Sequence, residues 1–423
     1  MKARKKPVEW IRLDNAAKIF PPTTSDKDTK VFRFVCELKE EINTEILQKA
    51  LNNTITLFPI FQTVLRRGVF WYYFEKTDLI PVVSEENKLP CSMLYSQIRK
   101  NLLFEVTYYK KRINLEMYHA VTDGTGALGF FKTMIYYYLT ELHGKDFGAK
   151  LPDLDYDASF SQKTEDSYSK YYNGDKKLDH IKLTKAYQIA GRRSIDNRLK
   201  VIEAEMSVKE VIDLAHKYDT TLTIYLTALF IQSIFRDMPD RSRKYPVVFS
   251  VPVNLRTYFP SATARNFFAT VNIKYNYKEG SDQLVNIIQE VKESFAKALT
   301  IDNLRKNLNG LSALEHNAFM RVIPLALKDH ILRFATTLHD RGITATLSNV
   351  GKITITKEFT PYIQMFDCFV SSRRPQISMC SFEDQLVISF TSPFIGTDIQ
   401  KNFFRMLTQE GVGISIASNS NEV

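Results

Sequence analysis

The residues with the clearest chemical potential lie in "NLEMYHAVTDGTGALGFF", where His119, Asp123 and Gly124 fall close together. Histidine is the usual general base near neutral pH because its unperturbed pKa is about 6.5. Asp123 could orient the imidazole, or turn away and pair with an arginine that fixes the loop. Gly124 tolerates backbone angles that other residues resist, and lets a substrate approach the main chain. The alternative is structural: Asp123 caps a helix, and His119 merely ends a strand.

The elements around these residues would hold them rigidly. An apolar, strand-like run ends in His119, and helical periodicity predicts a helix from about Thr125 to His143 that stops at Gly144. Such strand-to-helix junctions hold catalytic groups on rigid elements. A catalytic base is therefore a reasonable hypothesis for His119.

The rest of the chain shows the same mixture of strands and helices, which predicts an α+β fold. In the first half we expect a strand at Val31–Leu38 and a helix at Asn43–Phe58 with Asn43 as its N-cap. In the second half we expect a helix after Ser207, an apolar helix at Thr221–Phe235, several strands, and a last helix near Asp398–Leu407.

A polar segment separates the two halves. Residues 151–194 are poor in aliphatic side chains and rich in Asp, Ser, Lys and Tyr, as in a surface excursion or linker. We therefore predict an N-terminal lobe at 1–175, a linker at 176–200 and a C-terminal lobe at 201–423. Two lobes of similar size favour a ligand site between them.

Composition excludes several classes of function. The net charge of +10 favours anionic partners, but the basic residues are scattered and no nucleic-acid motif accompanies them. The four cysteines are far apart, which argues against disulfides or a zinc cluster and favours a cytoplasmic location. No third metal ligand stands out near His119. The most apolar helix, Thr221–Phe235, is too short to span a bilayer.

Four stretches resemble a known family. "YHAVTDG" is similar to the HHxxxDG motif of the chloramphenicol acetyltransferase-like acyltransferases, which include alcohol acetyltransferases and peptide-synthetase condensation domains. "ALNNTITLFPIFQTVLRRGVFWYYFE", "VPVNLRTYFPSATARNFFATVNI" and "LSNVG" resemble other segments of the bacterial alcohol acetyltransferase-like branch. Together they cover most of the chain from about Trp10. Tyr118 replaces the first motif histidine, and the DFGWG segment of plant members is missing.

The resemblance implies a two-lobed pseudo-dimer, each lobe a mixed β-sheet flanked by helices. It also implies an acyltransferase in which His119 takes a proton from a hydroxyl or amine acceptor. The acceptor would then attack the thioester of acyl-CoA, or of an acyl-carrier protein, without a covalent acyl-enzyme. That mechanism fits the lack of a serine nucleophile motif such as G-x-S-x-G. It needs no tightly bound cofactor. A non-catalytic relative that keeps the fold is the remaining alternative.

The resemblance also assigns supporting residues. The motif aspartate of the family binds an arginine of the first lobe, and Arg66 matches that position best, with Arg67 as the second choice. Oxyanion stabilisation needs aimed donors, for which Ser348 and Asn349 are candidates. Arg256 could contact a phosphate or form a structural salt bridge. The candidates for lining the channel are Tyr118, Asn254, Arg256 and Asn266.

Overall fold

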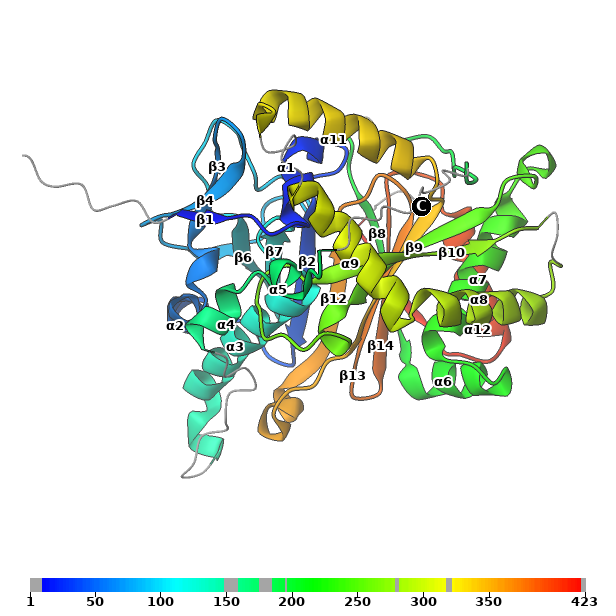
Figure 1. Cartoon of the computed structure of the whole chain (residues 1–423). Coiled ribbons are helices and arrows are strands. Elements are labelled where there is room, and N and C mark those ends of the chain that lie inside the picture. Colours follow the sequence, from blue (N-terminus) through cyan, green and yellow to red (C-terminus); the bar gives the residue numbers. More distant parts are fainter. Residues whose placement is uncertain are drawn as a thin grey trace, which may run out of the picture.

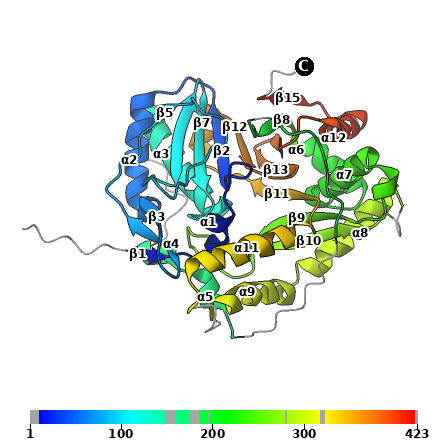
Figure 2. The ribbon, with the colours of Figure 1, turned by 90° about the horizontal axis from the view of Figure 1, so that it is seen from above.

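The computed structural model describes residues 10–147, 159–174, 185–194, 196–277, 281–316 and 322–419. Two sheets with helices on their outer faces lie side by side, and a small third sheet flanks the first (Figure 1). Strands of the C-terminal half run through the middle of the molecule, where the two main sheets lie next to each other (Figures 1 and 2). The expected α+β fold is confirmed.

The first main sheet carries His119 at a strand end. Its strand order is β12-β2-β7-β6-β5. The strands are β2 (Val31–Leu38), β5 (Ser84–Glu85), β6 (Phe104–Tyr109), β7 (Arg112–Tyr118) and β12 (Ile363–Val370). β12 comes from the C-terminal half and pairs antiparallel with β2, so the two halves of the chain share this sheet. The sequence predicted several strands in the second half, but not that one of them pairs with β2.

The small sheet has the order β1-β4-β3. Its strands are β1 (Trp10–Arg12), β3 (Thr63–Arg67) and β4 (Tyr72–Lys76), and β3 and β4 form an antiparallel hairpin.

The second main sheet has seven strands in the order β10-β9-β11-β13-β14-β8-β15. β11 runs parallel to β9 and β13, and the other pairs are antiparallel, so the sheet is mixed. The strands are β8 (Lys200–Ser207), β9 (Val247–Asn254), β10 (Phe268–Tyr275), β11 (Ala345–Lys352), β13 (Gln376–Phe382), β14 (Gln385–Ser392) and β15 (Ser415–Ser418).

Polar side chains cap the first turns of α2, α6 and α7. Asn43 accepts a hydrogen bond from Ile46 N, and Thr221 accepts one from Ile224 N, each satisfying a free amide of the first turn. Ser207 likewise accepts from Glu210 N. The helices are α1 (Phe20–Thr23), α2 (Thr44–Leu57), α3 (Gly124–His143), α4 (Phe160–Thr164), α5 (Ser167–Tyr171), α6 (Val208–Lys217), α7 (Leu222–Asp237), α8 (Leu284–Ala298), α9 (Ile301–His316), α11 (Leu325–Asp340) and α12 (Asp398–Gln409).

Two hydrophobic clusters form the cores. One lies around the first main sheet with α2 and α3, and the other around the second main sheet with α7, α8 and α12. Within the described ranges, no helix combines the length and hydropathy needed to cross a bilayer. All four cysteines are free and buried. Of the predicted linker, residues 176–184 and 195 lie outside the described residues.

Candidate functional site

His119 is the first residue after β7, at the end of a central strand of the first main sheet. Its main-chain N–H donates to Lys30 O at 2.8 Å, which continues the pairing of β7 with β2. A turn closed by Val121 N and Tyr118 O follows, and α3 begins at Gly124. The predicted strand-to-helix junction is present, with β7 before His119 and α3 after Asp123.

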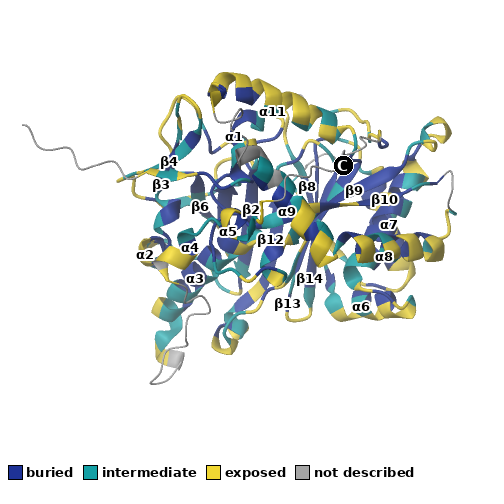
Figure 3. Cartoon of the chain, viewed as in Figure 1, coloured by how far each residue is buried: buried dark blue, intermediate teal, exposed yellow. Residues whose placement is uncertain are grey.

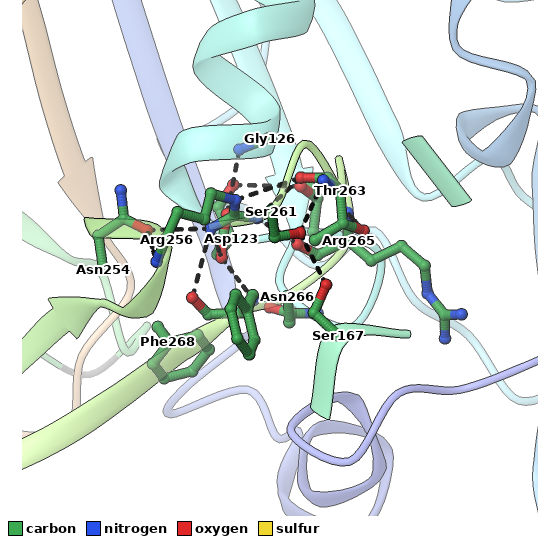
Figure 4. Close-up of polar contacts among 12 residues, drawn as sticks. Asp123, Gly126, Ser167, Asn254, Arg256, Ser261, Thr263, Arg265, Asn266 and Phe268 are labelled. Atoms are coloured by element: carbon green, nitrogen blue, oxygen red, sulfur yellow. Dashed lines mark hydrogen bonds and ion pairs between the residues drawn. The ribbon is translucent and has the colours of Figure 1, made fainter. Parts of the chain in front are cut away.

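Of the three roles that the sequence left open for Asp123, it fills two, the helix cap and the arginine partner. One carboxylate oxygen caps α3 by accepting from Gly126 N at 3.0 Å. The other accepts from Arg256 Nη1 and from Phe267 N, each at 2.7 Å (Figure 4). Helix cap and arginine partner are therefore combined in one side chain.

The prediction that Arg66 holds Asp123 is wrong. Arg66 lies on β3 of the small sheet and pairs with Glu75 of the neighbouring strand at 2.7 Å, while Arg67 reaches Asp329 at 3.3 Å. Arg256 takes the place beside Asp123 instead. Arg66 does not pair with Asp123 because it lies on the small sheet, where its side chain pairs with Glu75.

Arg256 forms the structural salt bridge rather than a free phosphate contact. Its side chain and that of Asp123 are 9% and 6% exposed. The remaining donors bind carbonyls of the loop that follows β9, namely Thr263 O and Arg265 O at 3.0 and 2.6 Å, and Phe267 O at 3.3 Å. The ion pair thus ties the His119 turn to the second half of the chain, and removing one partner would leave the other charged and buried.

Asn266 sets the protonation pattern of His119. Its Nδ2 faces two acceptors, Asp14 Oδ2 and Ala120 O, each at 3.4 Å. Its Oδ1 therefore turns to His119 Nδ1, at 3.3 Å, and accepts a hydrogen bond from it. With the proton on Nδ1, Nε2 carries the lone pair that a general base needs.

Three phenylalanines surround the imidazole. The Phe20 ring stacks on it with centroids 4.6 Å apart, Phe32 meets it edge-on at 5.0 Å, and Phe268 lies 5.5 Å away. Desolvation by this surrounding lowers the pKa of His119 below 6.5, although the nearby Asp123 charge opposes the shift. The imidazole is therefore neutral at pH 7.

Asp14 is fully buried and contacts Asn266, the residue that binds His119. One of its oxygens accepts from Ala17 N at 2.8 Å, and the other faces Asn266. Burial raises its pKa to about 6, against the opposing charge of Arg265. Neither Asp14 nor Phe20 could be singled out from the sequence, because neither lies in a motif with chemical spacing.

Two glycines at the start of α3 differ in what they permit. A Cβ on Gly126 would lie 2.1 Å from Ala264 O, so this glycine lets α3 pack against the loop that holds Arg256. A Cβ on Gly124 would meet Phe34 at 3.9 Å, an ordinary contact. Gly124 is the first residue of α3 and has no positive φ, so its position does not require glycine's backbone freedom. Of the two reasons predicted for this glycine, only room for a substrate still applies.

The side chains of Tyr118 and Asn254 contact residues other than His119. Tyr118 is fully buried, with its hydroxyl 2.8 Å from Thr24 Oγ1 and its ring stacked on Tyr95. Asn254 is exposed and accepts from Arg256.

Ser348 and Asn349 lie on β11. The Asn349 amide donates to Thr223 Oγ1 and accepts from Gly351 N, each at 2.8 Å. In the described part of the chain, neither side chain has a hydrogen bond to His119.

Among known proteins, only solved structures are similar to this chain, and they identify its fold. No family model and no curated protein sequence matches the chain. Solved structures match over nearly its full length. Polyketide synthase associated protein 5 from Mycobacterium tuberculosis has a TM-score of 0.62 at 13% identity, with 95% of this chain and 97% of that chain covered. TRI3 trichothecene 15-O-acetyltransferase from Fusarium sporotrichioides gives 0.63 at 9%, covering 95% and 94%.

A third match is a mutant of the starter condensation domain of rhizomide synthetase in complex with C8-CoA. Its TM-score is 0.60 at 12% identity, and 95% of this chain and 94% of that chain are covered. The chain therefore has the two-lobed fold that the family resemblance implied.

Proposed function

We propose that the protein transfers an acyl group from a CoA thioester to a hydroxyl or amine, with His119 as the general base. The observation that carries the proposal is the contact of His119 Nδ1 with Asn266 Oδ1, which leaves Nε2 unprotonated among three phenyl rings. The fold supports it, because the similar structures include an acetyltransferase and a domain with bound C8-CoA.

The proposed reaction uses the unprotonated Nε2 of His119. Nε2 takes the proton of the acceptor, whose oxygen or nitrogen attacks the thioester carbonyl and forms a tetrahedral intermediate. When that intermediate collapses, the thiolate leaves and receives the proton from the imidazolium. The fixed Nδ1–H and the carboxylate of Asp123 favour the transient imidazolium. No bond to the protein is formed.

The remaining parts of the site belong to the same proposal. Ser348 or Asn349 would donate to the oxyanion once substrate is bound. The Asn349 side-chain N–H2 would then donate to the oxyanion as well as to Thr223 Oγ1. Gly124 leaves room for the acceptor. The predicted cytoplasmic location is also part of the proposal.

The experiment is thiol release from a panel of acyl-CoAs with mixed alcohol and amine acceptors. We expect acceptor-dependent release that falls by about 10² or more in His119→Ala, the usual reach of general-base catalysis. His216→Ala, on the exposed side of α6, is the matched control and should keep full activity. If the variant keeps wild-type rates, His119 is not the base.

Acyl-CoA binding is measured in parallel. If CoA binds but no acyl-CoA is turned over, an acyl-carrier protein becomes the candidate donor, and the same panel is repeated with acylated carrier protein. If neither donor reacts, the protein is a non-catalytic relative and the proposal fails.

A further inference from the structure

Asp14 is a buried carboxylate to which the proposed reaction gives no role. Its side chain is 0% exposed and contacts the start of the short helix η1 (Ala17–Ile19) and the loop that follows β9. β2 and β7, the strands beside His119, are also almost entirely buried (Figure 3). A charge buried this deeply is costly unless hydrogen bonds stabilise it, so the partners of Asp14 decide which protonation state fits the site.

Each hydrogen-bond or ion-pair contact that the described residues make with Asp14 comes from a donor. Ala17 N donates to Oδ1 at 2.8 Å, Asn266 Nδ2 lies 3.4 Å from Oδ2, and Arg265 Nε lies 3.7 Å from the same oxygen. Asp166, the N-cap of α5, acts on Asp14 through its charge. The ionised carboxylate is therefore matched by its partners, whereas a protonated carboxyl would face no acceptor for its own hydrogen.

Asn266 connects Asp14 to His119. Its Nδ2 faces Asp14 and a main-chain carbonyl, which leaves Oδ1 to accept from His119 Nδ1 at 3.3 Å. Half a turn about the Cβ–Cγ bond would exchange the oxygen and the nitrogen of this amide without changing its shape. The main chain of the loop would stay in place, because the next residue, Phe267, donates its N–H to Asp123 at 2.7 Å (Figure 4).

We propose that Asp14 is a positioning residue for the proposed base, because its negative charge holds the Asn266 amide in the orientation that keeps the proton of His119 on Nδ1. This inference rests on the proposed function of His119. When Asp14 is neutral, its hydrogen needs an acceptor, and the Asn266 oxygen supplies one if the amide turns over. Nδ2 then faces His119 Nδ1, which must accept. The imidazole proton then lies on Nε2, and the lone pair that the base needs is lost.

The ionised state of Asp14 is the main one at pH 7. Burial raises its pKa to about 6, against the opposing charge of Arg265, so the carboxyl is mostly deprotonated at neutral pH. The same segment of the chain also places Phe20 against the imidazole, with ring centroids 4.6 Å apart. Residues 14–20 therefore act on His119 by two routes, through the Asn266 amide and through direct packing.

The test is the tautomer of His119 in Asp14→Asn, read at pH 7 by NMR with nitrogen-15-labelled histidine. The remaining oxygen of the variant side chain should stay with Ala17 N, whose bond is the shorter one, so its N–H2 faces Asn266 and requires the turned amide. We expect the ring proton on Nε2 instead of Nδ1. We also expect kcat/KM for thiol release to fall by about 10² or more, since the wrong tautomer removes general-base catalysis.

Asp329→Asn is the matched control. Asp329 is 5% exposed and contacts the Tyr72 hydroxyl and Arg67, so this variant makes the same change at another buried aspartate with an arginine partner. It should leave the tautomer and the activity unchanged, and an equal change in both variants would overturn the proposal. A proton that stays on Nδ1 in Asp14→Asn would also overturn it. The main-chain oxygen of His119, which also favours a protonated ring, would then set the tautomer.

The tautomer and the turnover are separate measurements. If the wild type transfers no acyl group but Asp14→Asn moves the ring proton to Nε2, the proposed function fails while the action of Asp14 on His119 is confirmed. If the wild type is active and the ring proton does not move, the proposed function stands and the role of Asp14 fails.

A further measurement uses only the wild type and does not depend on the folding of a variant. In protein with carbon-13-labelled aspartate, the carboxyl carbon of Asp14 reports its ionisation while the histidine nitrogens report the tautomer. At pH 7 we expect an ionised Asp14 together with a proton on Nδ1 of His119. Wherever Asp14 is protonated, a neutral ring should carry its proton on Nε2. A protonated Asp14 beside a neutral ring with its proton on Nδ1 would overturn the proposal.

Discussion

Asn266→Ala removes the contact that fixes the proton on His119 Nδ1. The side chain is 1% exposed and its oxygen is 3.3 Å from the imidazole nitrogen. Leaving a buried partner without its hydrogen bond costs about 1–3 kcal/mol. If that cost falls on the reactive tautomer, kcat/KM should drop about 5- to 150-fold, since about 1.4 kcal/mol corresponds to a factor of ten.

The assay is kcat/KM for thiol release as a function of pH. Burial lowers the pKa of His119 below 6.5, so the wild type should lose activity only as pH falls through that lowered value, where the base becomes protonated. The Asn266 hydrogen bond acts in the opposite direction and raises this pKa. The variant should therefore show a lower plateau with its acid limb moved to lower pH.

Asn114→Ala is the control that distinguishes a loss of His119 positioning from a loss of stability. Asn114 is also buried, and its amide makes two comparable contacts, to Thr107 at 3.3 Å and Glu86 at 3.4 Å. It should lower the melting temperature by a similar amount without changing the plateau. If Asn266→Ala behaves like this control, Asn266 is only structural and the reasoning is refuted.

Three further predictions concern the support of the site. Asp123→Ala leaves Arg256 charged and buried and should lower the free energy of unfolding by about 3–5 kcal/mol in urea denaturation. Arg66→Ala breaks a partly exposed pair and should lower it by about 1 kcal/mol or less. Equal losses in the two variants would contradict the assignment of Arg256, rather than Arg66, as the partner of Asp123. Gly126→Ala should destabilise the fold, measured by thermal unfolding, because its Cβ would overlap a carbonyl; a wild-type melting temperature would refute this. Burial raises the pKa of Asp14 to about 6 in the folded protein, above its unfolded value, so the native state binds more protons. The stability contributed by this group therefore falls as pH rises from about 4 to about 6. Asp14→Asn should remove that pH dependence, and an unchanged pH profile of stability in the variant would contradict the prediction.

Local patterns in the sequence predicted much of the fold. Asn43 and Ser207 cap helices where their side chains and the following periodicity indicated, and β2 has the predicted bounds. The helix predicted from Thr221 begins one residue later, because Thr221 is its N-cap. The junction of strand, turn and helix around His119 was also predicted. These features are set by residues within a few positions of one another, so a single sequence contains their signal.

Contacts between distant segments were not predictable in the same way. Asp123 is paired with Arg256 rather than Arg66 because β9 and its following loop approach α3 in space, and spacing along the chain does not encode that approach. The pairing of β12 with β2 is of the same kind. Asp14 reaches His119 only through Asn266, so its residue type alone gave no reason to single it out.

The most direct test of the central claim is the protonation state of His119 by NMR with nitrogen-15-labelled histidine. The His119 signals are identified by their loss in His119→Ala. At pH 7 the account predicts a neutral ring with the proton on Nδ1 and an unprotonated Nε2. A proton on Nε2, or a charged imidazolium at that pH, would contradict the assignment of His119 as a base held ready by Asn266.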